Sequence, residues 1–146
     1  MNLPRTLVLS PILLPTVLYI GCNTSSRNEV TNVQSPDGRV EAVLYEANGG
    51  ATTSFGYEIE LRQKGQKKGI EIAQLDGAVR NENAYGVNLK WNGNEELDVE
   101  YFKAKWHSKF PSTANVDGKD IHVVVREGVI DPSAPSGGML YNLNRK

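Results

Sequence analysis

Strict alternation of apolar and polar residues is the feature that most constrains this chain. From Phe55 to Arg62, every odd-numbered residue is apolar and every even-numbered residue is glycine or charged. Successive side chains of a strand point to opposite faces, so this segment predicts a strand with one buried face. Related patterns predict further strands over 39–46, from 70 to 72 onward, and over 86–91, 97–101 and 120–126.

Turn signals separate these segments. Ser35-Pro36-Asp37-Gly38 precedes the first strand, and Asn92-Gly93-Asn94 joins two later ones. Residues 76–85 and 109–118 are polar and are expected to be loops. About six strands, with no helical spacing between them, predict an all-β fold. We expect a single small antiparallel meander that forms a sandwich or an open barrel, because each strand has one face to bury.

The first 21 residues differ from the rest of the chain. Arg5 is followed by an apolar stretch from Leu7 to Ile20, and polar residues begin at Asn23. The stretch is about 14 residues long, whereas a membrane-spanning helix needs about 20. A charged start, a short apolar core and a small residue before the polar segment are typical of a secretory signal. An ordinary signal peptide cleaved nearby, or a lone buried cysteine at position 22, is the alternative to lipidation of Cys22.

Gly21-Cys22, at the end of that apolar core, resembles the lipobox of bacterial lipoproteins. The resemblance implies that the leader 1–21 is removed and that the thiol of Cys22 is acylated. Residues 22–34 are then expected to be a flexible tether, because they are rich in Asn, Ser and Thr. Residues 35–146 would form the β domain. The implied location is the bacterial cell envelope, with the membrane as a partner through the lipid on Cys22.

Two further resemblances concern the domain itself. Ser35–Gly38, followed by a strand and a hairpin, resembles the start of a blade in periplasmic β-propellers. A propeller needs about four or more blades, so only a blade-like sheet is expected. The chain also resembles a family of small uncharacterised bacterial lipoproteins, through the lipobox, Ser35–Gly38, the loop Gly50-Ala51-Thr52-Thr53 and a later strand with Trp91. This family brings no activity with it.

Composition excludes several classes of protein. The chain has 16 basic and 17 acidic residues, a net charge of −1, which excludes the basic footprint of a dedicated nucleic-acid binder. Its single cysteine excludes an internal disulfide and a multi-cysteine zinc site. His107 and His122 are the only histidines, and no carboxylate accompanies either at a ligand spacing. We therefore expect no metal, no cofactor and no partner among nucleic acids.

Two segments are candidate binding sites. The loop from 49 to 54 carries Gly49, Gly50, Thr52 and Thr53, which favour either anion binding through backbone amides or a tight connection between strands. The segment from 101 to 110 interleaves aromatic and basic residues, among them Lys103, Lys105 and Trp106. Such a segment suits sugar polymers or anionic lipid headgroups, or it is a strand end with solvated lysines.

These observations favour a non-enzymatic envelope lipoprotein that binds an unknown envelope protein or polymer, with no catalytic residues. A small envelope hydrolase or metal-dependent enzyme is one alternative. It requires several carboxylates gathered in one pocket, and the candidates are Glu58, Glu60, Glu71, Asp98 and Glu100. A module that inhibits an enzyme through its 49–54 loop is the other alternative.

Overall fold

The computed structural model describes residues 26–48, 55–81 and 84–130. Within these ranges the chain is all-β, with strands in two main sheets and no helix. The first sheet has the order β1-β2-β3-β4-β9: β1 (Ser26–Gln34), β2 (Val40–Asn48), β3 (Phe55–Gln63), β4 (Ile70–Asp76) and β9 (Trp106–His107). The second has the order β10-β11-β8-β7: β10 (Thr113–Val116), β11 (Lys119–Glu127), β8 (Glu96–Tyr101) and β7 (Val87–Trp91). A small third pair joins β5 (Arg80–Asn81) to β6 (Ala84–Tyr85).

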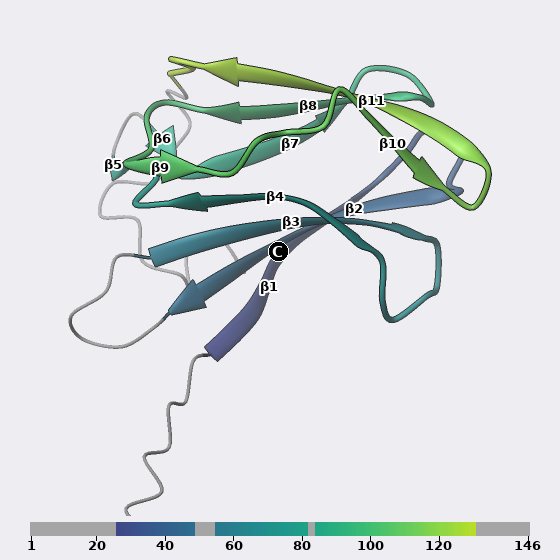
Figure 1. The fold of residues 1–146 in the computed structure, drawn as a ribbon, viewed down its shortest axis with the longest axis horizontal. Helices are drawn as coiled ribbons and strands as arrows, with labels where there is room; N and C mark the ends of the chain where they lie inside the picture. Colours follow the sequence, from purple (N-terminus) through teal and green to yellow (C-terminus); the bar gives the residue numbers. More distant parts are fainter. Residues whose placement is uncertain (1–25, 49–54, 82–83, 131–146) are drawn as a thin grey trace, which may run out of the picture.

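The two main sheets pack face to face as a sandwich, with the four-stranded sheet above β1–β4 (Figure 1). The alternating apolar residues of β2, β3, β7, β8 and β11 point into the space between the sheets and form one core. Ile59, Leu61, Leu97, Val99 and Ile121 are completely buried there. The predicted all-β fold class and its sandwich form are therefore confirmed.

The sandwich has two distinct ends. We call the end where β1 begins the proximal end; β5, β6 and β9 also lie there, at the left of Figure 1. The opposite end is the distal end. It holds four connections: the turn 35–39, the β3–β4 connection, the turn 92–95 and the β10–β11 hairpin.

Strand β1 corrects the expected tether. Residues 26–34 pair antiparallel with β2 along its whole length, so only residues 22–25 of the expected tether lie outside the described residues. The register shifts between Glu29 and Thr31, which breaks the period-two pattern. Among residues 27–34, whose burial the structure describes, the apolar side chains that pack against the core are Val30 and Val33. A polar edge strand with a bulge carries almost no apolar alternation, and this is why the sequence pattern suggested a tether.

The pairing of β8 with β11 corrects the antiparallel prediction, because these two strands run parallel. After Tyr101 the chain crosses to the first sheet, where β9 pairs with β4, and then returns along β10. β10 and β11 form a hairpin whose turn places Asp117 and Gly118 at φ +52° and +79°. β11 therefore enters the second sheet from the distal end, as β8 does. The short strands β5, β6 and β10 also replace parts of two segments expected to be loops.

Candidate functional site

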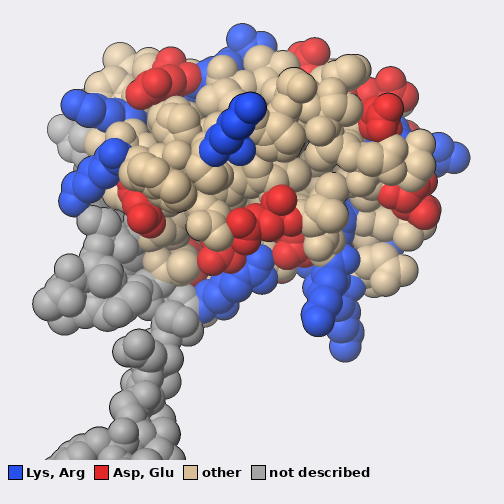
Figure 2. Space-filling view, in the orientation of Figure 1, with Lys and Arg blue, Asp and Glu red and all other residues tan. Residues whose placement is uncertain are grey.

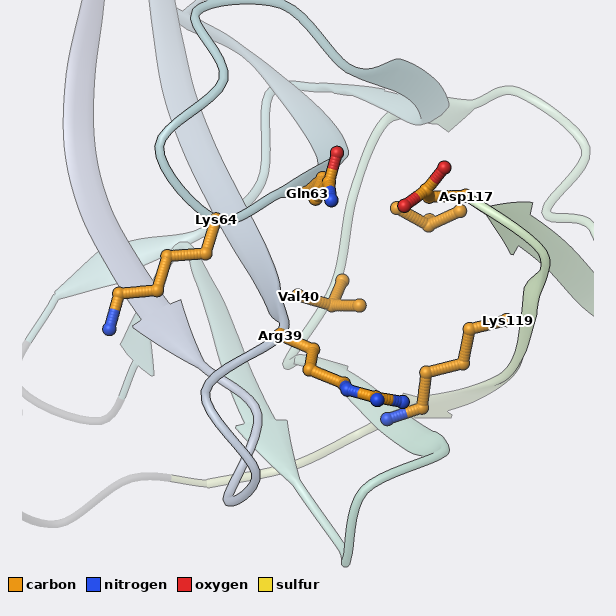
Figure 3. Close-up of a pocket in the computed structure, with 7 residues that line it drawn as sticks. Arg39, Val40, Gln63, Lys64, Asp117 and Lys119 are labelled. Atoms are coloured by element: carbon orange, nitrogen blue, oxygen red, sulfur yellow. The ribbon is translucent and has the colours of Figure 1, made fainter.

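A cavity of about 350 Å³ opens at the distal end. Its walls come from three connections that are far apart in the sequence: the residues that follow the 35–38 turn, the end of β3, and the β10–β11 hairpin (Figure 3). The lining residues are Arg39, Val40, Gln63, Lys64, Val116, Asp117 and Lys119. Val40 and Val116 are buried, and the five other side chains are polar or charged.

The turn 35–38 fixes one wall of this cavity. Ser35 is buried, and its backbone N–H donates to the carbonyl of Val40 at 2.8 Å. The Ser35 hydroxyl accepts from the N–H of Val40 at 3.0 Å and donates to Asp37 Oδ1 at 2.7 Å. Gly38 has φ +67°, which suits glycine, and its N–H donates to the carbonyl of Ser35 at 2.8 Å. This network holds Arg39 and Val40 in a fixed position at the start of β2.

An ion pair between Asp37 and Lys119 joins the two sheets beside the cavity. Lys119 Nζ lies 2.5 Å from Asp37 Oδ2, and both side chains are largely shielded from solvent. The pKa of the Asp37 carboxyl is well below its usual range because Lys119 and Ser35 donate hydrogen bonds to it. Asp37 thus stays ionised at neutral pH and holds Lys119 at the rim of the cavity.

The cations of the cavity are unevenly arranged. Figure 3 shows the side chains of Arg39 and Lys119 pointing toward one another on one side, with Gln63 and Asp117 on another. Lys64 points away from them, and its Nζ lies 3.8 Å from the place a Cβ on Gly38 would take. Asp37 already pairs with Lys119 and offsets part of its charge, and Arg39 adds a second positive charge beside this pair. The arrangement suits the binding of a carboxylate or a phosphate group, for which Arg also supplies a planar pair of donors.

Charge around the cavity extends into the β3–β4 connection. This connection contributes Lys67 and Lys68 in addition to Lys64, and all three are exposed. Figure 2 shows blue side chains that project at the lower right, where this connection lies in Figure 1. Carboxylates instead gather over the middle of β1–β3. The β3–β4 connection therefore adds positive charge near the cavity, whereas Asp37 and Asp117 place negative charge at its rim.

The structure places the predicted basic and aromatic residues at the proximal end, far from this cavity. Lys103, Lys105 and Trp106 are exposed on and beside β9, with Trp106 at 53% exposure. Gly49, Gly50, Thr52 and Thr53 lie outside the described residues, as does Cys22. None of the described residues that were predicted to bind a ligand lines the distal cavity.

The histidines lie on different sheets. The ring of His107 on β9 lies 6.1 Å from that of Tyr101 and 5.5 Å from that of Phe110, centroid to centroid. His122 on β11 is within hydrogen-bond distance of the Thr113 hydroxyl, with Nδ1 and Oγ1 3.3 Å apart. Among the described residues, no group of three or more His, Cys, Asp or Glu is arranged to hold a metal ion.

The carboxylates considered for catalysis do not gather in one pocket. Glu58 and Glu60 lie on the outer face of the first sheet, where Arg27 contacts both, at 2.5 and 3.1 Å. Asp98 and Glu100 are on β8, in the other sheet.

Asp98 is the most buried of these carboxylates. Burial alone would raise the pKa of Asp98, but hydrogen bonds from Arg126 and Asn92 outweigh it and lower the pKa. The distances are 2.7 Å from Arg126 Nε and 2.6 Å from Asn92 Nδ2. Asp98 is therefore a paired, ionised structural group in this arrangement.

The cavity residues gave little signal in the sequence. The turn chemistry of Ser35–Gly38 and the glycines of the β3–β4 connection mark two of its walls as turns, and nothing in the spacing shows that they converge.

In the described part of the chain, no helix is long and apolar enough to cross a membrane. Compared with protein-family models, with curated proteins and with solved structures, the chain has no match.

Proposed function

We propose that this protein is a non-enzymatic binding module of the bacterial cell envelope, attached to the membrane through acylated Cys22, whose distal cavity binds an anionic group. The observation that carries the proposal is the convergence of Arg39 and Lys119 at the rim of a cavity of about 350 Å³. That volume is at the lower end of the roughly 300–1,000 Å³ range of small-molecule sites. The envelope location rests on the leader and on the position of Cys22.

The chemistry of the lining defines the ligand class. Lys119 is already paired with Asp37, so the guanidinium of Arg39 has the greater capacity to bind an incoming oxyanion. The amide of Gln63 offers additional hydrogen bonds, and Val40 and Val116 offer apolar contact to a short carbon chain. A small molecule or a polymer unit with a phosphate or carboxylate group next to carbon atoms fits this lining.

The lining also supports binding without catalysis. It contains no histidine, cysteine, serine or threonine among the described residues. Asp37 beside it is held ionised by Lys119, and an ionised carboxylate with a strongly lowered pKa is a poor proton donor or base at neutral pH. Of the five candidate carboxylates, Glu58, Glu60 and Glu71 lie in the first sheet and Asp98 and Glu100 in the second, and this separation favours binding over hydrolysis.

Titration calorimetry with inorganic pyrophosphate and with citrate tests the cavity. Arg39→Gln with Lys64→Gln removes two of the cations that line the cavity, and each charged contact to a ligand is worth about tenfold or more in affinity. We expect the double variant to bind either probe at least tenfold more weakly, and binding to weaken as salt rises. Lys103→Gln with Lys105→Gln is the control, because it changes the net charge equally at the proximal end.

Equal affinity of the two double variants would contradict the proposal, as would a wild-type chain that binds neither probe. Preference for one probe identifies phosphate or carboxylate as the group that is bound. Mass spectrometry of the mature N-terminus tests the attachment separately. An intact Met1 or an unmodified Cys22 in protein isolated from membranes would contradict it.

A further inference from the structure

The start of β1 and the exposed residues of β9 lie at the same end of the first sheet, on its two opposite edges. Consecutive register pairs cross the first sheet along this end: Ser26–Asn48, Asn48–Phe55, Gly56–Asp76 and Asp76–Trp106. Trp106 therefore lies at the same end of the sheet as the first described residue of the chain. In Figure 1, β9 lies at the upper left, and β1 begins below it, at the bottom of the sandwich and left of its centre.

Four residues at this end form what we call the β9 patch: Phe102, Lys103, Lys105 and Trp106. Trp106 is 53% exposed and Phe102 36% exposed, and both lysines are exposed. Blue side chains, with red ones among them, appear at this end in Figure 2. Large apolar side chains that remain exposed beside lysines are common where a protein meets a membrane surface.

Backbone hydrogen bonds hold the patch against the first sheet. The N–H of Lys105 donates to the carbonyl of Asp76 at 2.9 Å, and the N–H of Val79 donates to the carbonyl of Lys103 at 2.9 Å. The aliphatic part of Lys105 lies over Gly77, where a Cβ would come within 2.7 Å of it. The patch is thus a fixed part of the sandwich, and a surface that contacts it orients the whole domain.

The length of chain before β1 limits where a lipid on Cys22 can be. Cys22 lies four positions before Ser26, and four residues span at most about 14 Å. The nine residues of β1 extend for about 30 Å toward the distal end. A bilayer that holds the lipid therefore lies close to the proximal end, and the distal cavity lies a strand length further away.

We propose that the β9 patch rests on an anionic phospholipid bilayer and directs the distal cavity away from it. This inference rests on the proposed attachment at Cys22. Trp106 and Phe102 would enter the headgroup region, and Lys103 and Lys105 would contact lipid phosphates. Each lysine near an anionic surface favours contact by about fivefold, so the two lysines bias the orientation but do not anchor the protein. Asp76, which is opposite Trp106 in the register, opposes part of this attraction.

The two tryptophans make the orientation measurable. Trp106 is in the β9 patch, whereas Trp91 ends β7 at the distal end, where its Nε1–H donates to the carbonyl of Val33 at 3.0 Å. The full chain has one cysteine, so a maleimide lipid couples it to vesicles at Cys22 alone. Trp91→Phe leaves Trp106 as the reporter, and Trp106→Phe leaves Trp91.

In vesicles of phosphatidylcholine and phosphatidylglycerol with a brominated lipid, we expect Trp106 emission to shift to shorter wavelength and to be quenched. Trp91 emission should be unaffected. Lys103→Gln with Lys105→Gln should lower the ratio of protein with the patch on the bilayer to protein with the patch in water by about 25-fold. Arg39→Gln with Lys64→Gln, which removes the same charge at the distal end, should leave Trp106 quenching unchanged.

Quenching of Trp91 equal to that of Trp106, or a Trp106 signal that vesicles do not alter, would overturn the orientation. Fluorotryptophan in the wild-type chain supplies the same two reporters by NMR if Trp91→Phe does not fold. Coupling through Cys22 is chemical here, so a negative result bears on the patch alone. Mass spectrometry of the mature N-terminus bears on the natural attachment alone.

Discussion

The bond from Trp91 to Val33 predicts how strongly the polar strand β1 is held. β1 is an edge strand, and beyond its ladder with β2 this indole bond of 3.0 Å joins it to the second sheet. Trp91→Phe removes the donor, at about 1 kcal/mol for a hydrogen bond to a shielded carbonyl. The smaller ring buries roughly 40 Å² less apolar surface, which is about 1 kcal/mol more.

We therefore expect Trp91→Phe to lower the free energy of unfolding by about 2 kcal/mol, a sizeable share of the roughly 5–15 kcal/mol typical of a domain. Urea denaturation followed by far-UV circular dichroism measures it. Trp106→Phe is the matched control, because Trp106 is 53% exposed and should lose less than about 0.5 kcal/mol. Hydrogen exchange should show the largest loss of protection in the amides of β1.

Two results would refute this reasoning. One is equal destabilisation by the two tryptophan substitutions. The other is a Trp91→Phe variant in which the amides of β1 keep their protection while those of β3 lose it. In the first case burial of Trp91 has no special role, and in the second the indole bond does not hold β1.

Two other predictions concern stability. The pKa of Asp37 and that of Asp98 are lowered in the folded protein, so both carboxylates stabilise it at neutral pH, and that contribution is lost as pH falls below their ordinary values near 4. Urea midpoints measured from neutral pH downward should fall in that acidic range, and a midpoint that does not change would be inconsistent with both ion pairs. Gly69→Ala should cost about 3 kcal/mol in thermal or urea unfolding, because a Cβ there lies 2.1 Å from the carbonyl oxygen of Leu61. Gly65→Ala, at φ +81° with open space around it, should cost only about 1 kcal/mol, and equal losses would contradict the clash.

Alternation in the sequence was sufficient to predict the strands that line the core. β3 follows its predicted bounds closely, because Tyr57, Ile59 and Leu61 all lie in the core and no bulge interrupts the pattern before Ile59. β1 was missed for the opposite reason. Its outward side chains are polar or charged, and Arg27 and Glu29 contact groups on neighbouring strands that the sequence does not place nearby.

Strand order and the cavity were beyond the reach of the sequence pattern. Alternation is the same whether a strand has parallel or antiparallel neighbours, so nothing in residues 120–126 indicated that β11 would run parallel to β8. The cavity depends on that order, because Lys119 meets Asp37 only when the β10–β11 hairpin lies over the turn 35–39. The lysines and Trp106 at the proximal end were predicted as a binding segment, and this remains a prediction.

The central position of β11 has a consequence for the order in which the protein assembles. β1–β4 are joined by successive local connections, so the greater part of the first sheet needs only neighbouring segments to meet. β11 lies between β10 and β8, and its parallel pairing with β8 joins His122 to Glu96 across a long intervening segment. Closing such a segment is entropically costly, and non-local pairing slows folding. We expect the first sheet to form early and the insertion of β11 to limit the rate of folding. The described strand nearest the C-terminus is then the one whose pairing completes the sandwich.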